Sequence, residues 1–415
     1  MSLHTLGRRF PFLVNSGYAT ITAASAGLLL ILLTIAGRFL SVDDYGRFNY
    51  ALALTTIIET VMDIGLGPVT VRAVARDRDA ADRLFRHVLG LKLVWVAIGL
   101  GLLAVVAPVL RSDPQVIRLC YLMGLSSAVR SYLLTARGLL QGLDRFDLEA
   151  VVVVADRLLL LASGGAALWA GYGLFGLAMS FVGSRVVMLF AVMLLLRRVV
   201  GSLVPRFDRA AWRDLQTAAL PIGFFMIALN LYTYIDTVIL GVIGTNAENG
   251  LYGVAYRVYE GLTYAPSILA AVLSPRLSYL FVHDRPAHRH LLARGLLGSV
   301  LLGIVLGGIA VLAARPILVT LFGAAYAPAV QPLQILAGGA LFVFGTWILH
   351  AAAVSTNLDR RLLLTTVVGL SANVIFNLVF IPRWGISGAA GATVIAEAIT
   401  VVLLWIQVQR RLRLA

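Results

Sequence analysis

The sequence has a single cysteine, a single lysine and few charged residues of any kind. Because Cys120 is the only cysteine, neither an intrachain disulfide nor a cysteine-based metal cluster is possible. Charged residues make up 13% of the chain and hydrophobic residues 60%, whereas charged residues are about 25% of a typical soluble domain. This composition excludes a soluble domain and is typical of a protein that crosses the membrane several times.

Enzyme signatures are also lacking. The sequence has no glycine-rich phosphate-binding loop with a lysine, no zinc-ligand spacing and no nucleophile elbow. It therefore predicts no catalytic residue, no metal site and no cofactor. A membrane-embedded glycan polymerase or ligase is the alternative from another class. Such an enzyme needs a sizeable outer loop for its catalytic residues, and the longest outer loop expected here, residues 314–328, has no room for one.

Apolar runs of about 20 residues, the length of a membrane-spanning helix, recur along the chain. They predict helices at residues 14–39, 46–67, 87–110, 116–138, 148–170, 174–197, 215–241, 251–273, 290–314, 328–352, 361–381 and 387–409. The expected fold is therefore an all-α polytopic membrane protein with about 12 transmembrane helices.

Positive charge is concentrated at alternate ends of these helices. The formal net charge is +14, and arginine supplies almost all of it because Lys92 is the only lysine. Twenty-three arginines fall in the N-terminal segment, alternate loops and the C-terminal tail, against four in the other loops. Cytoplasmic loops carry the excess of positive charge, so both termini are expected in the cytoplasm. Arginines spread over short loops do not indicate a nucleic-acid partner.

The chain divides into two similar halves. We expect an N-terminal six-helix lobe at residues 1–200, a cytoplasmic linker at 201–214 and a C-terminal six-helix lobe at 215–415. The pair Tyr45-Gly46 recurs 207 residues later as Tyr252-Gly253. An even number of helices gives both halves the same orientation, so a parallel pseudo-two-fold repeat about the membrane normal is expected. This arrangement predicts a substrate path between two bundles.

The most unusual span is the stretch 251–278, which is apolar enough to cross a bilayer but carries Arg257, Glu260 and four tyrosines. At 100° per residue these charges and three of the tyrosines share one arc, with apolar residues opposite. Charges in a membrane helix are costly and usually face a cavity or a partner. The stretch is therefore the first candidate for a working surface, and polar residues also gather on the spans at 14–39, 46–67 and 215–241.

Two runs of the sequence resemble a known family. IAGRFLSVDDYGRFNYALAL, followed by DIGLGPVTVRAVAR, resembles the opening of Wzx-type polysaccharide flippases of the multidrug/oligosaccharidyl-lipid/polysaccharide (MOP, MATE-like) exporter superfamily. AYRVYEGLTYAPSILAAVLSPRLS is similar to the eighth helix of that superfamily, including the lipid II flippases, which have an arginine where Arg257 stands. The resemblance covers essentially the whole chain. About 12 helices depart from the 14 of a lipid II flippase.

The resemblance implies a cavity lined by the first two helices of each half and alternating access between the two bundles. It also implies that the protein flips an undecaprenyl-pyrophosphate-linked oligosaccharide across the bacterial inner (plasma) membrane for export of cell-surface polysaccharide. The implied partners are the lipid-linked oligosaccharide, membrane lipids, and a polysaccharide polymerase with its chain-length machinery, and the protein is expected to be a monomer.

Residue chemistry suggests roles within such a cavity. Guanidinium groups suit a pyrophosphate, aromatic faces and hydroxyls suit sugars, and acidic groups within the membrane can carry a coupling H⁺ or Na⁺. The substrate-binding candidates are Arg257, Arg38, Tyr232, Tyr252, Tyr256, Tyr259 and Asn49, and the ion-coupling candidates are Asp63, Glu59, Asp236 and Glu260.

Each candidate also has a purely structural interpretation. Arg257 and Glu260 stand three residues apart and can neutralise each other. Arg38 can extend to the membrane interface, the tyrosines can anchor there, and Glu59 and Asp63 can face the arginines that follow their helix. For the function, the alternative is a MATE-like cation-coupled multidrug antiporter, although the many cationic groups favour an anionic cargo.

Overall fold

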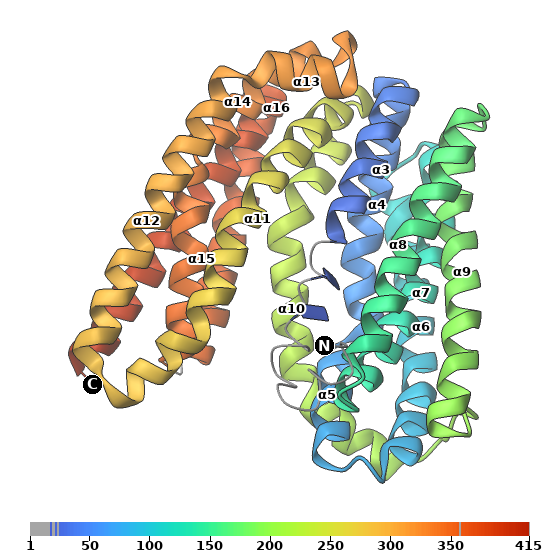
Figure 1. Ribbon diagram of the computed structural model, residues 1–415. Helices are drawn as coiled ribbons and strands as arrows, with labels where there is room; N and C mark the ends of the chain where they lie inside the picture. Colours follow the sequence, from blue (N-terminus) through green and yellow to red (C-terminus); the bar gives the residue numbers. More distant parts are fainter. Residues whose placement is uncertain (1–16, 19–20, 23–24, 357, 415) are drawn as a thin grey trace, which may run out of the picture. The chain divides into compact units, whose positions relative to one another are not determined.

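The computed structural model describes residues 17–18, 21–22, 25–356 and 358–414 (Figure 1). Parts of the first predicted helix, at residues 14–16, 19–20 and 23–24, lie outside the described residues. All regular structure in the described residues is helical. The chain forms two compact units. The first comprises Met1–Leu40 with Ala51–Asn230, and the second Ser41–Tyr50 with Leu231–Ala415.

The first unit is a set of long helices that run side by side (Figure 1). It contains α3 (Ala26–Phe39), most of α4 (Val42–Asp63), α5 (Leu66–Arg76), α6 (Ala81–Leu110), α7 (Pro114–Gly142), α8 (Phe146–Trp169), α9 (Gly173–Val200) and the first part of α10 (Arg209–Ile243). An apolar cluster in its interior joins Phe85 of α6, Leu139 of α7 and Val192 of α9.

The second unit begins with the first turns of α4 and the end of α10. It continues with α11 (Asn246–His283), α12 (Arg285–Leu312), α13 (Ala314–Phe322), the 3₁₀ helix η1 (Ala324–Ala329), α14 (Val330–Gly338), α15 (Ala340–Ser355) and α16 (Asp359–Leu414). Leu277, Leu292, Ile348 and Leu404 share its main apolar cluster.

The described helices do not correspond one to one with the predicted spans. Eight are long and apolar enough to cross a membrane, or nine if the bent pair Ala324–Gly338 and Ala340–Ser355 is one span. Two predicted spans lie within α16, which carries a non-helical residue, Gly385, near its middle. A third is α7, which has Arg130 and several serines near its centre, and a fourth is α3, which has 14 residues in the described part.

The helix α11 is longer than its predicted span of 251–273. It starts at Asn246 because Thr245 and Glu248 form a capping box: the Glu248 N–H donates to Thr245 Oγ1 (3.1 Å) and the Thr245 N–H donates to Glu248 Oε2 (2.8 Å). It then continues past Pro266 and Pro275 to His283. Hydropathy detects the apolar stretch within a helix, and it does not detect the polar turns that extend it.

A break separates α4 from α5 where one helix, 46–67, was predicted. Ile64 has φ 44° and Gly65 has φ 81°. A β-branched residue rarely adopts a positive φ, so the packing around Ile64 must hold it there. A Cβ on Gly65 would lie 2.6 Å from the Ala219 carbonyl oxygen, so only glycine lets α10 approach the break this closely.

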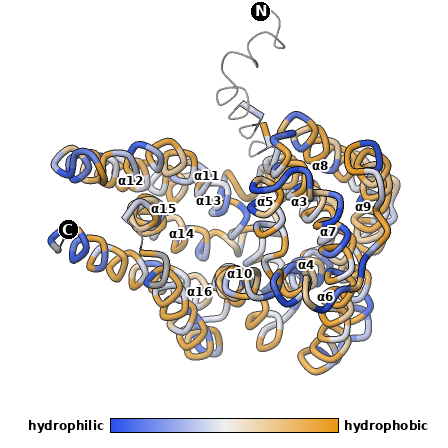
Figure 2. Tube along the Cα trace, turned by 90° about the horizontal axis from the view of Figure 1, so that it is seen from below, coloured by the Kyte–Doolittle hydropathy of each residue, from blue (hydrophilic) through white to orange (hydrophobic). Residues whose placement is uncertain are grey.

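Apolar residues also cover much of the outside of the helices. Hydrophobic stretches run along α6, α9 and α16 in Figure 2, and exposed side chains include Val105, Phe190 and Leu301. Large exposed apolar surfaces mark contact with a membrane or another protein. Together with the long apolar helices, they agree with a multi-pass membrane protein.

Candidate functional site

Eight of the eleven candidate residues lie in the second unit. They come from the start of α4 (Asn49), the end of α10 (Tyr232, Asp236) and α11 (Tyr252, Tyr256, Arg257, Tyr259, Glu260). The other three, Arg38, Glu59 and Asp63, lie in the first unit.

The start of α4 crosses α11 at backbone contact. A Cβ on Gly46 would lie 1.7 Å from the Asn246 carbonyl oxygen, and one on Gly253 would lie 2.7 Å from Asn49 Nδ2. The glycines of the two repeated Tyr-Gly pairs therefore meet at one crossing, where no side chain fits. This approach places Asn49 against α11, where its Nδ2 donates to Asn249 Oδ1 (2.8 Å).

Arg257 lies at this crossing with its charge already engaged. The side chain is 9% exposed. Its Nη1 donates to Glu260 Oε2 (2.6 Å) and its Nη2 donates to Asn49 Oδ1 (3.3 Å). The neutralising pair that the sequence left open is therefore present. An incoming phosphate would have to share Arg257 with Glu260, which is 26% exposed.

Three tyrosines follow the same helix in ring contact. The ring centroids of Tyr252 and Tyr256, and those of Tyr256 and Tyr259, are 5.9 Å apart. Tyr252 is fully buried, and the Tyr256 hydroxyl donates to the Thr233 carbonyl oxygen (3.2 Å). Burial of Tyr252 does not fit an interfacial anchor, since anchors lie at the level of the headgroups.

Asp236 is a buried acid surrounded by uncharged donors. Its carboxylate accepts hydrogen bonds from the Tyr252 hydroxyl, the Thr237 N–H (2.6 Å) and the Thr393 hydroxyl (3.3 Å). Asp236 is 1% exposed, and it makes no ion pair in the part of the chain that the structure describes. A buried carboxylate without a counter-charge is costly unless it binds a cation or a proton.

The acidic candidates of the first unit are both in ion pairs. Asp63 Oδ1 lies 2.5 Å from Lys92 Nζ, and Glu59 Oε1 lies 2.8 Å from Arg130 Nη1. In the structural alternative these acids face the arginines that follow their helix, but the partners that the structure gives them come from α6 and α7. Asp63 Oδ2 also accepts the Gly67 N–H (3.4 Å) in the first turn of α5.

Arg38 lies in the last turn of α3 and is exposed. Tyr232, the remaining candidate, is half-buried on α10. Among the described residues no group of three or more His, Cys, Asp or Glu side chains is placed to hold a metal ion.

Three residues that bind candidate side chains were not predicted from the sequence: Lys92, Thr393 and Asn249. Lys92 is completely buried, and its signal was that the only lysine lies inside a predicted span. The Thr393 hydroxyl donates to Asp236, and Asn249 Oδ1 accepts from Asn49. Single threonines and asparagines are too common in membrane helices to stand out in a sequence. Glu397 is also buried, and accepts a hydrogen bond from Thr346 (3.2 Å).

Comparison with protein families gives a match over most of the chain. A family profile described as polysaccharide biosynthesis protein matches residues 15–281. A protein of Haloferax volcanii described as a probable low-salt glycan biosynthesis flippase, Agl15, is 27% identical over 174 residues. That alignment covers 41% of this chain and 37% of Agl15.

Two solved structures share the fold. An inward-facing multidrug resistance MATE family transporter of the MOP superfamily superposes with a TM-score of 0.79 at 14% identity, covering 93% of this chain and 94% of that one. Lipid II flippase MurJ, in an inward closed conformation, also gives 0.79, at 15% identity over 94% and 87% of the two chains. The likeness confirms the predicted all-helical, MATE-like membrane fold.

Proposed function

Because the chain belongs to the polysaccharide biosynthesis protein family, we propose that it is a flippase for a polyprenyl-pyrophosphate-linked oligosaccharide. Its family and fold are those of transporters and flippases rather than enzymes. The observation that carries the proposal is that one helix, α11, holds both Arg257 and a row of three tyrosines in ring contact. An arginine fork suits the pyrophosphate and aromatic rings suit the sugars of one and the same cargo.

The proposed cargo-binding residues follow from these two kinds of contact, arginine with pyrophosphate and aromatic rings with sugars. Arg257 would hold the pyrophosphate, and Arg38 is the anion ligand that we propose in the first unit. The glycan contacts would be Tyr232, Tyr252, Tyr256, Tyr259 and Asn49. The protein would move the cargo by alternating access, with its six-helix lobes at residues 1–200 and 215–415 joined by the linker 201–214.

Expression in a strain without its own polysaccharide flippase tests this function. Surface polysaccharide should return, as measured by gel staining of cell-surface glycan, and susceptibility to cationic drugs should not change in a strain without drug exporters. Drug resistance without any return of polysaccharide would instead support the MATE-like multidrug antiporter, whose fold is equally similar.

Asp236 is the acid that we propose for ion coupling. Glu59, Asp63 and Glu260 are paired with arginine or lysine, whereas Asp236 has only uncharged donors around it. An acid without a fixed counter-charge is free to exchange a proton or Na⁺, and one that is already paired must first lose its partner.

Asp236→Asn should make flipping independent of the ion gradient. Asparagine keeps the shape of the side chain but carries no charge for a cation or proton to neutralise. The free energy that couples two binding sites is about 1–3 kcal/mol. The stimulation of flipping by the ion gradient should therefore fall at least about fivefold. The measurement is cargo flipping in proteoliposomes with and without H⁺ or Na⁺ gradients. Asp79→Asn makes the same substitution at an exposed carboxylate and is the matched control. Unchanged stimulation in Asp236→Asn would exclude Asp236 from coupling.

We further propose that both termini face the cytoplasm, that the protein works as a monomer, and that a polysaccharide polymerase with its chain-length machinery receives the cargo. The membrane would be the bacterial inner (plasma) membrane, although the relative Agl15 comes from Haloferax volcanii. The excess of arginine in alternate loops supports the orientation. An active periplasmic reporter enzyme fused to the C-terminus would contradict it.

A further inference from the structure

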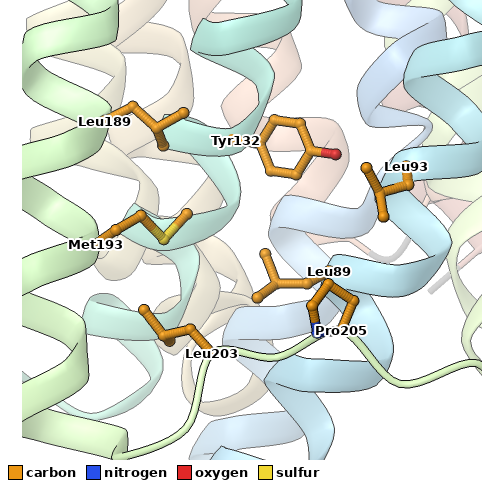
Figure 3. Close-up of a pocket in the computed structure, with 7 residues that line it drawn as sticks. All are labelled: Leu89, Leu93, Tyr132, Leu189, Met193, Leu203 and Pro205. Carbon is orange, nitrogen blue, oxygen red and sulfur yellow. The ribbon is translucent and has the colours of Figure 1, made fainter.

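A crevice in the first unit lies outside the proposed cargo surface (Figure 3). Its volume is about 250 Å³. Leu89 and Leu93 of α6 form one wall, Leu189 and Met193 of α9 form another, and Tyr132 of α7 forms the floor. The segment between α9 and α10 closes one end of the crevice with Leu203 and Pro205.

The lining is suited to a hydrocarbon chain. All the lining side chains except Tyr132 are apolar. The Tyr132 hydroxyl points toward Leu93 in Figure 3 and has no hydrogen-bond partner in the described part of the chain. Leu93 is 45% exposed and belongs to a membrane span whose surface is mostly unburied. The crevice therefore opens toward the surrounding lipid, and an apolar cavity takes up apolar groups rather than water.

Arg86 and Arg197 each lie about one helical turn from a lining residue, Leu89 and Met193, on the side of the connecting segment. Arg86 precedes Leu89 by three residues and Leu93 by seven on α6, so all three share one helix face. Arg197 follows Met193 by four residues on α9 and shares its face in the same way. Because α6 begins and α9 ends beside the same connecting segment, both arginines lie at the end of the crevice next to that segment.

The connecting segment is fixed to α6 at this point. Arg86 Nε donates to the Val204 carbonyl oxygen (2.9 Å), and the Arg206 N–H donates to the Arg86 carbonyl oxygen (2.9 Å). A Cβ on Gly90 would lie 2.4 Å from the Arg206 carbonyl oxygen. The crevice thus has an apolar body that is open to lipid and a basic end closed by backbone.

We propose that this crevice binds one anionic phospholipid of the surrounding bilayer. One acyl chain would lie between α6 and α9 over Tyr132, and the phosphate would lie at Arg197 and Arg86, because guanidinium groups bind phosphate oxygens in a fixed geometry. A polyprenyl-linked glycan would need room for sugars beyond its pyrophosphate, whereas the bonded segment at Val204 and Arg206 closes that end. The proposal does not depend on the function proposed above.

Native mass spectrometry of the full-length protein tests the site, with phosphatidylglycerol and phosphatidylcholine as the two probes. The wild-type protein should retain one phosphatidylglycerol more tightly than phosphatidylcholine. Arg197→Gln should weaken the retained phosphatidylglycerol about fivefold, the effect of one arginine at an anionic membrane surface. Arg410→Gln removes the same charge from the exposed end of α16 and should leave this binding unchanged.

A second variant tests the apolar body of the site without altering charge. Leu189→Trp places an indole in the crevice and should displace phosphatidylglycerol, while the thermal unfolding of the purified variant shows whether it is folded. Phosphatidylglycerol binding that stays at the wild-type level in both Arg197→Gln and folded Leu189→Trp would overturn the proposal. Preferential retention of undecaprenyl phosphate over phosphatidylglycerol would overturn it too, because the occupant would then be the carrier lipid.

Discussion

Arg257→Ala is expected to abolish glycan export, while Arg257→Lys retains part of it. Truncating one partner of a buried, hydrogen-bonded charge pair costs about 2–5 kcal/mol of binding free energy. If Arg257 binds the cargo, flipping should therefore fall at least about thirtyfold. Lysine keeps the charge but loses the planar fork that holds two phosphate oxygens. The measurement is flipping of lipid-linked oligosaccharide in proteoliposomes, normalised to the amount of folded protein.

The contact between Arg257 and Glu260 allows the binding role to be separated from simple neutralisation. Arg257→Ala leaves Glu260 without its partner, whereas Arg257→Ala combined with Glu260→Gln leaves no unpaired charge. If Arg257 binds the cargo, the double variant stays inactive and Glu260→Gln alone remains active. Return of export in the double variant would mean that Arg257 only neutralises Glu260, and full export by Arg257→Ala alone would also remove the anion-binding role.

Lys92→Met is expected to cause the largest loss of stability. Lys92 is fully buried and pairs with Asp63, and removal of one partner from a buried ion pair costs about 3–5 kcal/mol because the other charge stays behind. Methionine keeps an unbranched side chain of similar length. Thermal unfolding of the purified protein, followed by size-exclusion chromatography after heating, gives the measurement.

Removal of both charges should reverse most of that loss. Lys92→Met with Asp63→Asn leaves neither charge of this pair behind without its partner, and asparagine can still accept the Gly67 N–H in the first turn of α5. Arg78→Gln is the control, since it breaks the exposed pair of Arg78 with Asp144 and exposed pairs contribute little. A double variant no more stable than Lys92→Met would contradict the buried-pair explanation.

Hydropathy does not predict the break between α4 and α5. Residues 46–67 are apolar enough on average to predict one helix, but Ile64 and Gly65 leave the helical conformation. The cause is a contact between segments far apart in sequence, because the carbonyl of Ala219 in α10 lies against Gly65. A local pattern carries no information about such a contact.

The acidic candidates make the same point about chemistry. The sequence does not distinguish Asp63, Glu59 and Asp236, since each is an acidic residue within a predicted membrane span. The fold gives these acids different partners. Asp63 pairs with Lys92 and Glu59 pairs with Arg130. Asp236 accepts hydrogen bonds from Tyr252, Thr237 and Thr393. These partners are up to 157 residues away along the chain.

The sequence by itself determined the membrane class, most of the helices, the family resemblance and the arc of α11 that carries Arg257, Glu260 and the tyrosines. These features depend on residues close together along the chain, through the length of an apolar run and the 100° turn of a helix. The tertiary structure alone decided the glycine crossing of α4 with α11, the partners of each buried charge and the apolar crevice beside Tyr132. Those features depend on which helices pack together, because a buried charge takes its partner from whichever neighbouring helix presents one.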